Sequence, residues 1–99
     1  MVTVVYRMTT KPGREQEFIE LVKQFRESAL QTTGCITYTF YQSLTDTNSF
    51  IVYYRFASKE DQDQHVSNLI RKFGRAAAGS NLPLKFTELL AEDEVILFD

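Results

Sequence analysis

Short runs of β-branched and aromatic residues recur along this chain, and longer segments with a different spacing separate them. The runs lie at residues 2–8, 35–42, 50–56 and 94–98. Runs of this length and composition predict β-strands. A mostly polar stretch, 44–49, separates the second run from the third. We therefore expect these two strands to form a hairpin.

Between these runs, apolar residues recur at every third or fourth position, which predicts two amphipathic helices. The first helix is expected to have Pro12 near its first position and to end near Gly34, and its apolar stripe is Phe18, Leu21, Val22, Phe25 and Ala29. The second begins at a Ser58 cap, stops at Gly79, and has a stripe of Val66, Leu69, Ile70, Phe73, Ala76 and Ala77. A short third helix after Ser80–Pro83 is expected to carry Phe86, Leu89 and Leu90.

The order of these elements predicts the fold. The chain has 99 residues and contains no repeat or linker, so we expect a single domain over residues 1–99. The order strand-helix-strand-strand-helix-strand is that of the ferredoxin-like split βαβ plan. We predict an α+β fold in which a four-stranded antiparallel sheet carries helices on one face.

The strands place large apolar residues on both faces of the sheet, although the helices can cover only one. Ile51 and Tyr53 lie opposite the face shared by Phe50, Val52, Tyr54 and Phe56, and Val5 lies opposite Val2, Val4, Tyr6 and Met8. An exposed apolar face marks a contact surface. Pairing with a second copy through this open face is the favoured interpretation, since two-fold pairing of identical patches is common. The alternative is a stacking platform for a ligand such as RNA bases.

Composition narrows the set of partners and compartments. The net charge is −2 and the pI about 5.4, and the cluster Arg71, Lys72 and Arg75 fits a solvated helix face, so nucleic acid is not expected to bind. No signal peptide is evident and no apolar run approaches the length of a membrane span, so we expect no membrane partner. A single cysteine, Cys35, is expected to be a buried, inert thiol in a reducing compartment, most simply the cytoplasm.

Few residues of the chain could bind a metal or phosphate or take part in catalysis. One His and one Cys, far apart in the chain, give no metal site, and the four isolated glycines form no phosphate-binding loop. His65 lies at the edge of the second helical stripe, where it either faces the seam between helix and sheet as a proton acceptor or is a capping or surface residue. Tyr6 shares a face with Val4 and Met8 and is the best pocket candidate among the tyrosines.

An ordered set of short motifs carries a family resemblance over nearly the whole chain. The set comprises Lys11-Pro12-Gly13, Phe18, Gly34-Cys35, Tyr38, Tyr41-Gln42, Asp46, Asn48, Phe50, Arg55-Phe56 and His65. In this order and spacing the chain resembles the antibiotic biosynthesis monooxygenase domain of the dimeric α/β-barrel superfamily. The resemblance implies a homodimer whose sheets pack face to face, with a pocket between sheet and helices in each subunit.

The resemblance also implies a function. It suggests a monooxygenase that needs no cofactor and acts on a small aromatic, quinol-type substrate, with His65 assisting deprotonation and Tyr6, Tyr54 and Phe56 as the pocket wall. The family commonly has an acidic residue at position 54 and Trp at 56. Its haem degraders have Asn at 6 and Trp at 65, so haem degradation is not expected. The competing hypothesis is a non-catalytic ligand-binding or stress-response dimer on the same fold.

Overall fold

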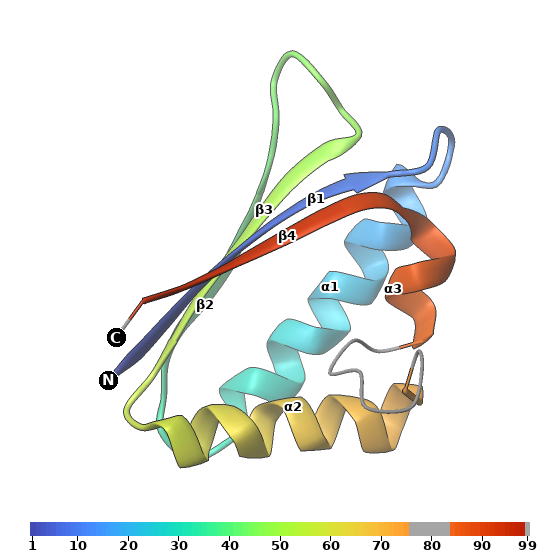
Figure 1. The fold of residues 1–99 in the computed structure, drawn as a ribbon. Helices are drawn as coiled ribbons and strands as arrows, with labels where there is room; N and C mark the ends of the chain where they lie inside the picture. The colour runs from blue at the N-terminus through green and yellow to red at the C-terminus, as the bar shows by residue number, and fades with distance from the viewer. Residues whose placement is uncertain (76–83, 99) are drawn as a thin grey trace.

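The computed structural model of the chain describes residues 1–75 and 84–98. Its elements are β1 (Val2–Thr10), α1 (Glu15–Leu30), β2 (Cys35–Gln42), β3 (Ser49–Phe56), α2 (Lys59–Phe73), α3 (Leu84–Leu89) and β4 (Leu90–Phe98). The four strands form one antiparallel sheet in the order β2-β3-β1-β4. All three helices lie against the same face of this sheet (Figure 1). The predicted α+β, ferredoxin-like fold is therefore confirmed.

Three predicted boundaries differ from the structure. Helix α1 begins at Glu15, because Gly13 has a φ of 81° and belongs to a turn that precedes the helix. Helix α2 ends at Phe73, since Gly74 adopts a φ of 78° and its N–H caps the carbonyl of Ile70. The predicted stop at Gly79, the alanines at 76–77 and the start at 80–83 lie outside the described residues.

Strand β4 begins at Leu90, four residues before its predicted start at Glu94. The added residues include Glu92 and Asp93, which have low β propensity and so concealed the strand. They pair with β1 nonetheless, Glu92 with Thr9 and Asp93 with Met8. Acidic side chains suit this position because β4 is an edge strand, where charge discourages further strand pairing.

The core lies between the sheet and the helices. Alternate residues of β1 and β3 face it, and the buried ones are Val2, Val4, Met8, Thr10, Phe50, Val52, Tyr54 and Phe56. From α1, Phe18 and Phe25 pack against them and are at most 1% exposed. Phe18 lies 4.7 Å from Phe50 and Phe25 lies 4.8 Å from Phe86 between ring centroids, so aromatic contacts join the sheet, α1 and α3.

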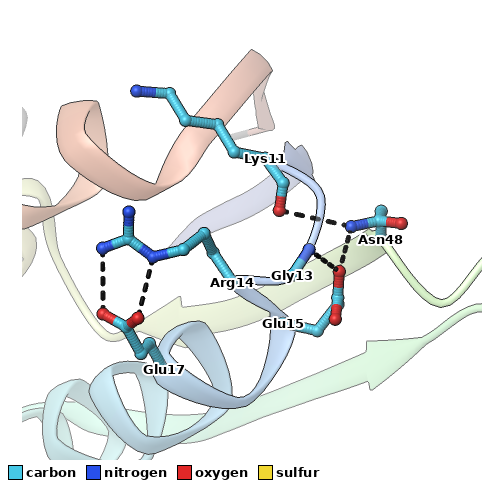
Figure 2. A network of polar contacts seen from close by, with 6 residues as sticks. All are labelled: Lys11, Gly13, Arg14, Glu15, Glu17 and Asn48. Carbon is cyan, nitrogen blue, oxygen red and sulfur yellow. Dashed lines mark hydrogen bonds and ion pairs between the residues drawn. The ribbon is translucent and has the colours of Figure 1, made fainter.

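A polar network ties the β2–β3 hairpin to the turn before α1 (Figure 2). The side-chain amide of Asn48 donates to Glu15 Oε1, to Thr10 Oγ1 at 3.0 Å and to the Lys11 carbonyl at 3.4 Å. Glu15 in turn accepts from the N–H of Gly13 at 2.9 Å. The hairpin and the start of α1 are thus held together by one amide and one carboxylate, and we call this group the Asn48 network.

Candidate functional site

The N-terminal turn of α2 is placed by contacts with the chain segment that precedes β2. Ser58 caps the helix, its hydroxyl oxygen accepting from the N–H of Asp61 at 3.1 Å. Asp61 lies against Gly34, whose φ is 84°, so a side chain at position 34 would collide with the Asp61 carboxylate. Two turns further along the helix, the Asn68 amide donates to Thr32 Oγ1 at 3.3 Å. These contacts bring α2 close to the sheet.

This placement buries His65 against β2 and β3. Its ring centroid lies 5.2 Å from those of Tyr54 and Phe56 and 5.8 Å from that of Tyr38, with Phe56 stacked and the two tyrosines edge-on. His65 is only 1% exposed. The interpretation of His65 as a capping or surface residue is therefore wrong, and its ring belongs to the seam between helix and sheet.

The buried imidazole is held in its neutral form. Burial lowers the pKa of His65 to about 4, because an aromatic environment solvates the charged form poorly. Its Nδ1 is buried and has no hydrogen-bond partner among the residues that the structure describes. An unpaired buried polar atom costs free energy and marks a position where a ligand or water can bind.

A small cavity of about 40 Å³ lies beside the imidazole. Its lining comes from the sheet, α1, α2 and α3, and comprises Tyr6, Met8, Phe25, Tyr38, Val52, Tyr54, His65, Val66, Leu69 and Phe86. This volume is enough for water but small beside the roughly 150 Å³ of a cavity that takes a benzene ring. Any larger ligand must therefore displace aromatic side chains as it enters.

Two tyrosine hydroxyls of the cavity wall have polar partners of different kinds. Tyr54 OH accepts from the amide of Gln62 at 3.4 Å, and Tyr6 OH donates to the carboxylate of Asp93 at 3.5 Å. Burial raises the pKa of both phenols, and for Tyr6 the charge of Asp93 raises it further. Both tyrosines therefore stay protonated at neutral pH.

The structure brings the four predicted site residues together. Tyr6, Tyr54 and His65 line the cavity, while Phe56 is outside the lining and stacks on the imidazole. Sequence reasoning missed Tyr38, which stacks on Tyr54 at 5.3 Å with the rings 2° from parallel. The register pairs Tyr38 with Tyr54, so a correct hairpin alignment was the signal that could have found it.

Sequence reasoning also missed the polar partners Gln62 and Asp93, which no motif indicated. The thiol of Cys35 is partly buried rather than fully buried, and burial raises its pKa. Arg71 and Lys72 are exposed in the last turn of α2, as expected for a solvated helix face, whereas Arg75 is exposed but lies beyond the end of the helix.

Within residues 1–75 and 84–98, no group of three or more His, Cys, Asp or Glu side chains could hold a metal ion. No helix there is long and apolar enough to cross a membrane.

A larger groove of about 490 Å³ lies at the hairpin end of the sheet and crosses the open face. Tyr41 and Ile51 line it from β2 and β3, and Arg7, Glu92 and Glu94 line it from β1 and β4. Tyr41 is 59% exposed and Ile51 is 39% exposed. The open face thus carries apolar side chains, as predicted, but with charged residues between them.

Comparison with known proteins identifies the family to which this chain belongs. Residues 1–77 match the antibiotic biosynthesis monooxygenase family, and the chain belongs to that family. An uncharacterized Synechocystis protein, sll1783, is 33% identical over 64 residues, which cover 65% of this chain and 44% of that protein. The matched region therefore spans less than half of that relative.

Solved structures share the fold. The structure of Rv0793 from Mycobacterium tuberculosis superposes with a TM-score of 0.80 at 20% identity, covering 99% of this chain and 92% of that one. A structure described as an antibiotic biosynthesis monooxygenase gives 0.74 at 18% identity, covering 100% and 97%. A conserved protein from Methanosarcina mazei gives 0.73 at 26% identity, covering 98% and 89%.

Proposed function

We propose that this chain is a monooxygenase that requires no cofactor and oxidises a small aromatic, quinol-type substrate in the cavity between sheet and helices. The observation that supports this most is the buried His65, whose unpartnered Nδ1 lies in an aromatic cluster beside a cavity lined by Tyr6 and Tyr54. Membership of the antibiotic biosynthesis monooxygenase family adds to it. Phe56 stacks on the imidazole.

The proposed chemistry uses the electron-rich ring of the substrate as the reductant. His65 accepts the proton of a substrate hydroxyl, and the resulting oxyanion reacts with dioxygen. One oxygen atom becomes a new carbonyl oxygen of the product, and the other leaves as water, so a phenol and O₂ give a quinone and H₂O. The aromatic walls exclude solvent water from the reacting ring. The imidazolium formed is stabilised by the neighbouring oxyanion, which offsets its low pKa in the empty site.

Oxygen uptake with a panel of quinols and phenols tests the role of His65. We expect His65→Ala to lower the rate at least tenfold, and His65→Gln to do the same, since an amide can hold a substrate but cannot take its proton. Ser67→Ala, an exposed position on the same helix, is the matched control. Full activity in both His65 variants would exclude the imidazole from the reaction.

A non-catalytic ligand-binding or stress-response protein is the second candidate function. The observation that favours it is the pKa of His65 near 4, which makes the imidazole a weak base in the empty cavity. This candidate predicts saturable binding of aromatic ligands with no oxygen consumption. Oxygen uptake that depends on His65 would exclude it.

We also infer that two copies pair through the open face of the sheet. Apolar Val5, Tyr41, Ile51 and Tyr53 lie there beside two cations, Arg7 and Arg55, and two anions, Glu92 and Glu94. In the described part of the chain none of these four charges forms an ion pair. A face with balanced, unpaired charges is complementary to itself, which suits two-fold pairing.

Sedimentation velocity tests the pairing. We expect a dimer at micromolar concentration and a monomer for Ile51→Glu, which adds a charge to the open face. Leu30→Glu is the matched control, because Leu30 is equally apolar and 49% exposed but lies at the end of α1. A wild-type monomer, or a dimer that survives Ile51→Glu, would contradict this inference.

The free thiol of Cys35 suits a reducing compartment, and on that ground we infer that the protein resides in the cytoplasm.

A further inference from the structure

Tyr6 lies between the cavity and the acidic segment of β4. It lines the cavity, and its ring meets Phe86 edge-on at 6.1 Å between centroids. Its hydroxyl donates to Asp93 Oδ2 at 3.5 Å, which is long for such a bond. Asp93 pairs with Met8, two residues along β1 from Tyr6, so the two side chains lie on the same, helix-covered side of the sheet. Asp93 itself is exposed, so it contacts the cavity wall from outside through Tyr6.

The chemistry of this partner sets the direction of the hydrogen bond. A carboxylate has no proton to donate, and the charge of Asp93 raises the pKa of the Tyr6 hydroxyl, which therefore keeps its proton. The single proton of the Tyr6 hydroxyl is therefore drawn to Asp93, and only the lone pairs of its oxygen remain for a ligand. Tyr54 differs, because its partner Gln62 carries an amide, which can donate or accept.

The two neighbouring acids cannot do the same. Glu92 pairs with Thr9 and Glu94 with Arg7, and both therefore lie on the open face, away from the cavity. Among the acidic side chains of β4 that the structure describes, Asp93 is the one bonded to a residue of the cavity wall.

We propose that Asp93 is a positioning residue that makes Tyr6 a hydrogen-bond acceptor, so that the cavity selects aromatic ligands with a hydroxyl group over those with a carbonyl group at the same place. This inference rests on the proposed function, since it assumes an aromatic ligand in the cavity. Beyond the proposed function, Asp93 would let the cavity distinguish the reduced, hydroxyl-bearing form of a ring system from its oxidised, carbonyl-bearing form, although Asp93 is not part of the cavity lining.

Calorimetric binding of two probes to the full chain, measured without oxygen so that neither probe is oxidised, tests the selection. The probes are 1-naphthol, which donates, and 1-tetralone, which has a similar bicyclic shape but only accepts. We expect wild type to prefer 1-naphthol about tenfold, the worth of roughly one hydrogen bond. In Asp93→Asn the amide can donate to the Tyr6 oxygen and release the Tyr6 proton, so the preference is expected to fall to about twofold or to invert. Glu27→Gln makes the same charge change at an exposed position of α1, outside both the cavity lining and the open face, and should bind like wild type.

A double-mutant cycle asks whether Asp93 acts through Tyr6. Tyr6→Phe should lose the preference, and adding Asp93→Asn to it should change the ratio of the two dissociation constants no further. A second, additive loss in the double variant would overturn the positioning role. A merely structural role for Asp93 would weaken both probes alike and leave their ratio unchanged.

The outcomes separate this inference from the proposed function. If wild type binds the probes and Asp93→Asn keeps the wild-type ratio, the role of Asp93 is wrong while the aromatic-ligand site stands. If wild type binds neither probe at millimolar concentration, the proposed site fails and the selection by Asp93 fails with it. Asp93 is exposed, so its isosteric replacement is expected to leave the fold intact.

Discussion

The two faces of the sheet are made from the same strands but have opposite character. On the covered face, Val52, Tyr54 and Phe56 of β3 are at most 7% exposed and pack against the helices. On the open face of the same strand, Ile51 is 39% exposed and Tyr53 and Arg55 are partly buried. Adjacent residues thus differ in burial because successive side chains of a strand point to opposite faces.

The difference between the faces shows where chemistry can reside. Among the described residues, the covered face encloses a small cavity beside Nδ1 of His65, a buried polar atom without a hydrogen-bond partner. The open face has a broad groove, exposed apolar groups and balanced charges. The covered face therefore suits a small buried ligand, whereas the open face suits a second protein surface.

Truncation of a covered-face residue should have the largest effect on stability. Phe18 is fully buried between Phe50 and Phe86. Phe18→Ala is expected to lower the free energy of unfolding by about 3–5 kcal/mol, from lost burial and the cavity left behind. Urea denaturation of the monomer measures this. A loss below about 1 kcal/mol would show that the covered face is not packed as described.

Acid should weaken the covered face through His65. Its pKa is about 4 in the folded chain against about 6.5 when unfolded, so between these pH values only the unfolded state binds the proton. Stability is therefore full above about pH 6.5 and falls as the pH drops to 4, by roughly 3 kcal/mol from this group. Unfolding free energies of wild type and His65→Leu between pH 4 and 7 measure it. Equal pH slopes in the two proteins would place the imidazole in contact with water.

Loss of the Asn48 network should have an intermediate effect on stability, because this network joins the β2–β3 hairpin to the turn before α1. Asn48→Ala removes the bonds to Thr10, Lys11 and Glu15 and is expected to cost about 1–2 kcal/mol. Thr47→Ala, at the neighbouring exposed position, is the control. The midpoint of thermal unfolding reports both, and equal midpoints would show that the network contributes nothing.

Truncation on the open face should have the smallest effect on the isolated chain. Ile51→Ala is expected to cost about 0.5–1 kcal/mol when the protein is dilute and monomeric, since the side chain is already partly in water. Val52→Ala, the next residue along β3, is buried and should cost more. Equal losses at the two positions would remove the contrast between the faces.

The sequence determined the elements and the two faces of the strands. Spacing within ten or fifteen residues is enough to distinguish a period of two from one of 3.6, so the strand at 35–42 and the stripe of α1 were predicted correctly. The cap at Ser58 was also readable, because capping depends on neighbours three residues away. The end predicted for α2 at Gly79 was too late, because Gly74 already ends the helix.

The tertiary structure alone decided three features: the environment of His65, the contact of Asp93 with the cavity wall, and the length of β4. Asp93 bonds Tyr6 across 87 positions of sequence, and that contact exists only because β4 pairs with β1 in one register. His65 is buried because α2 crosses β2 and β3 there, which places Tyr38 and Tyr54 around its ring. Local periodicity assigns a residue to a face, but strand register and helix crossing decide which side chains meet there.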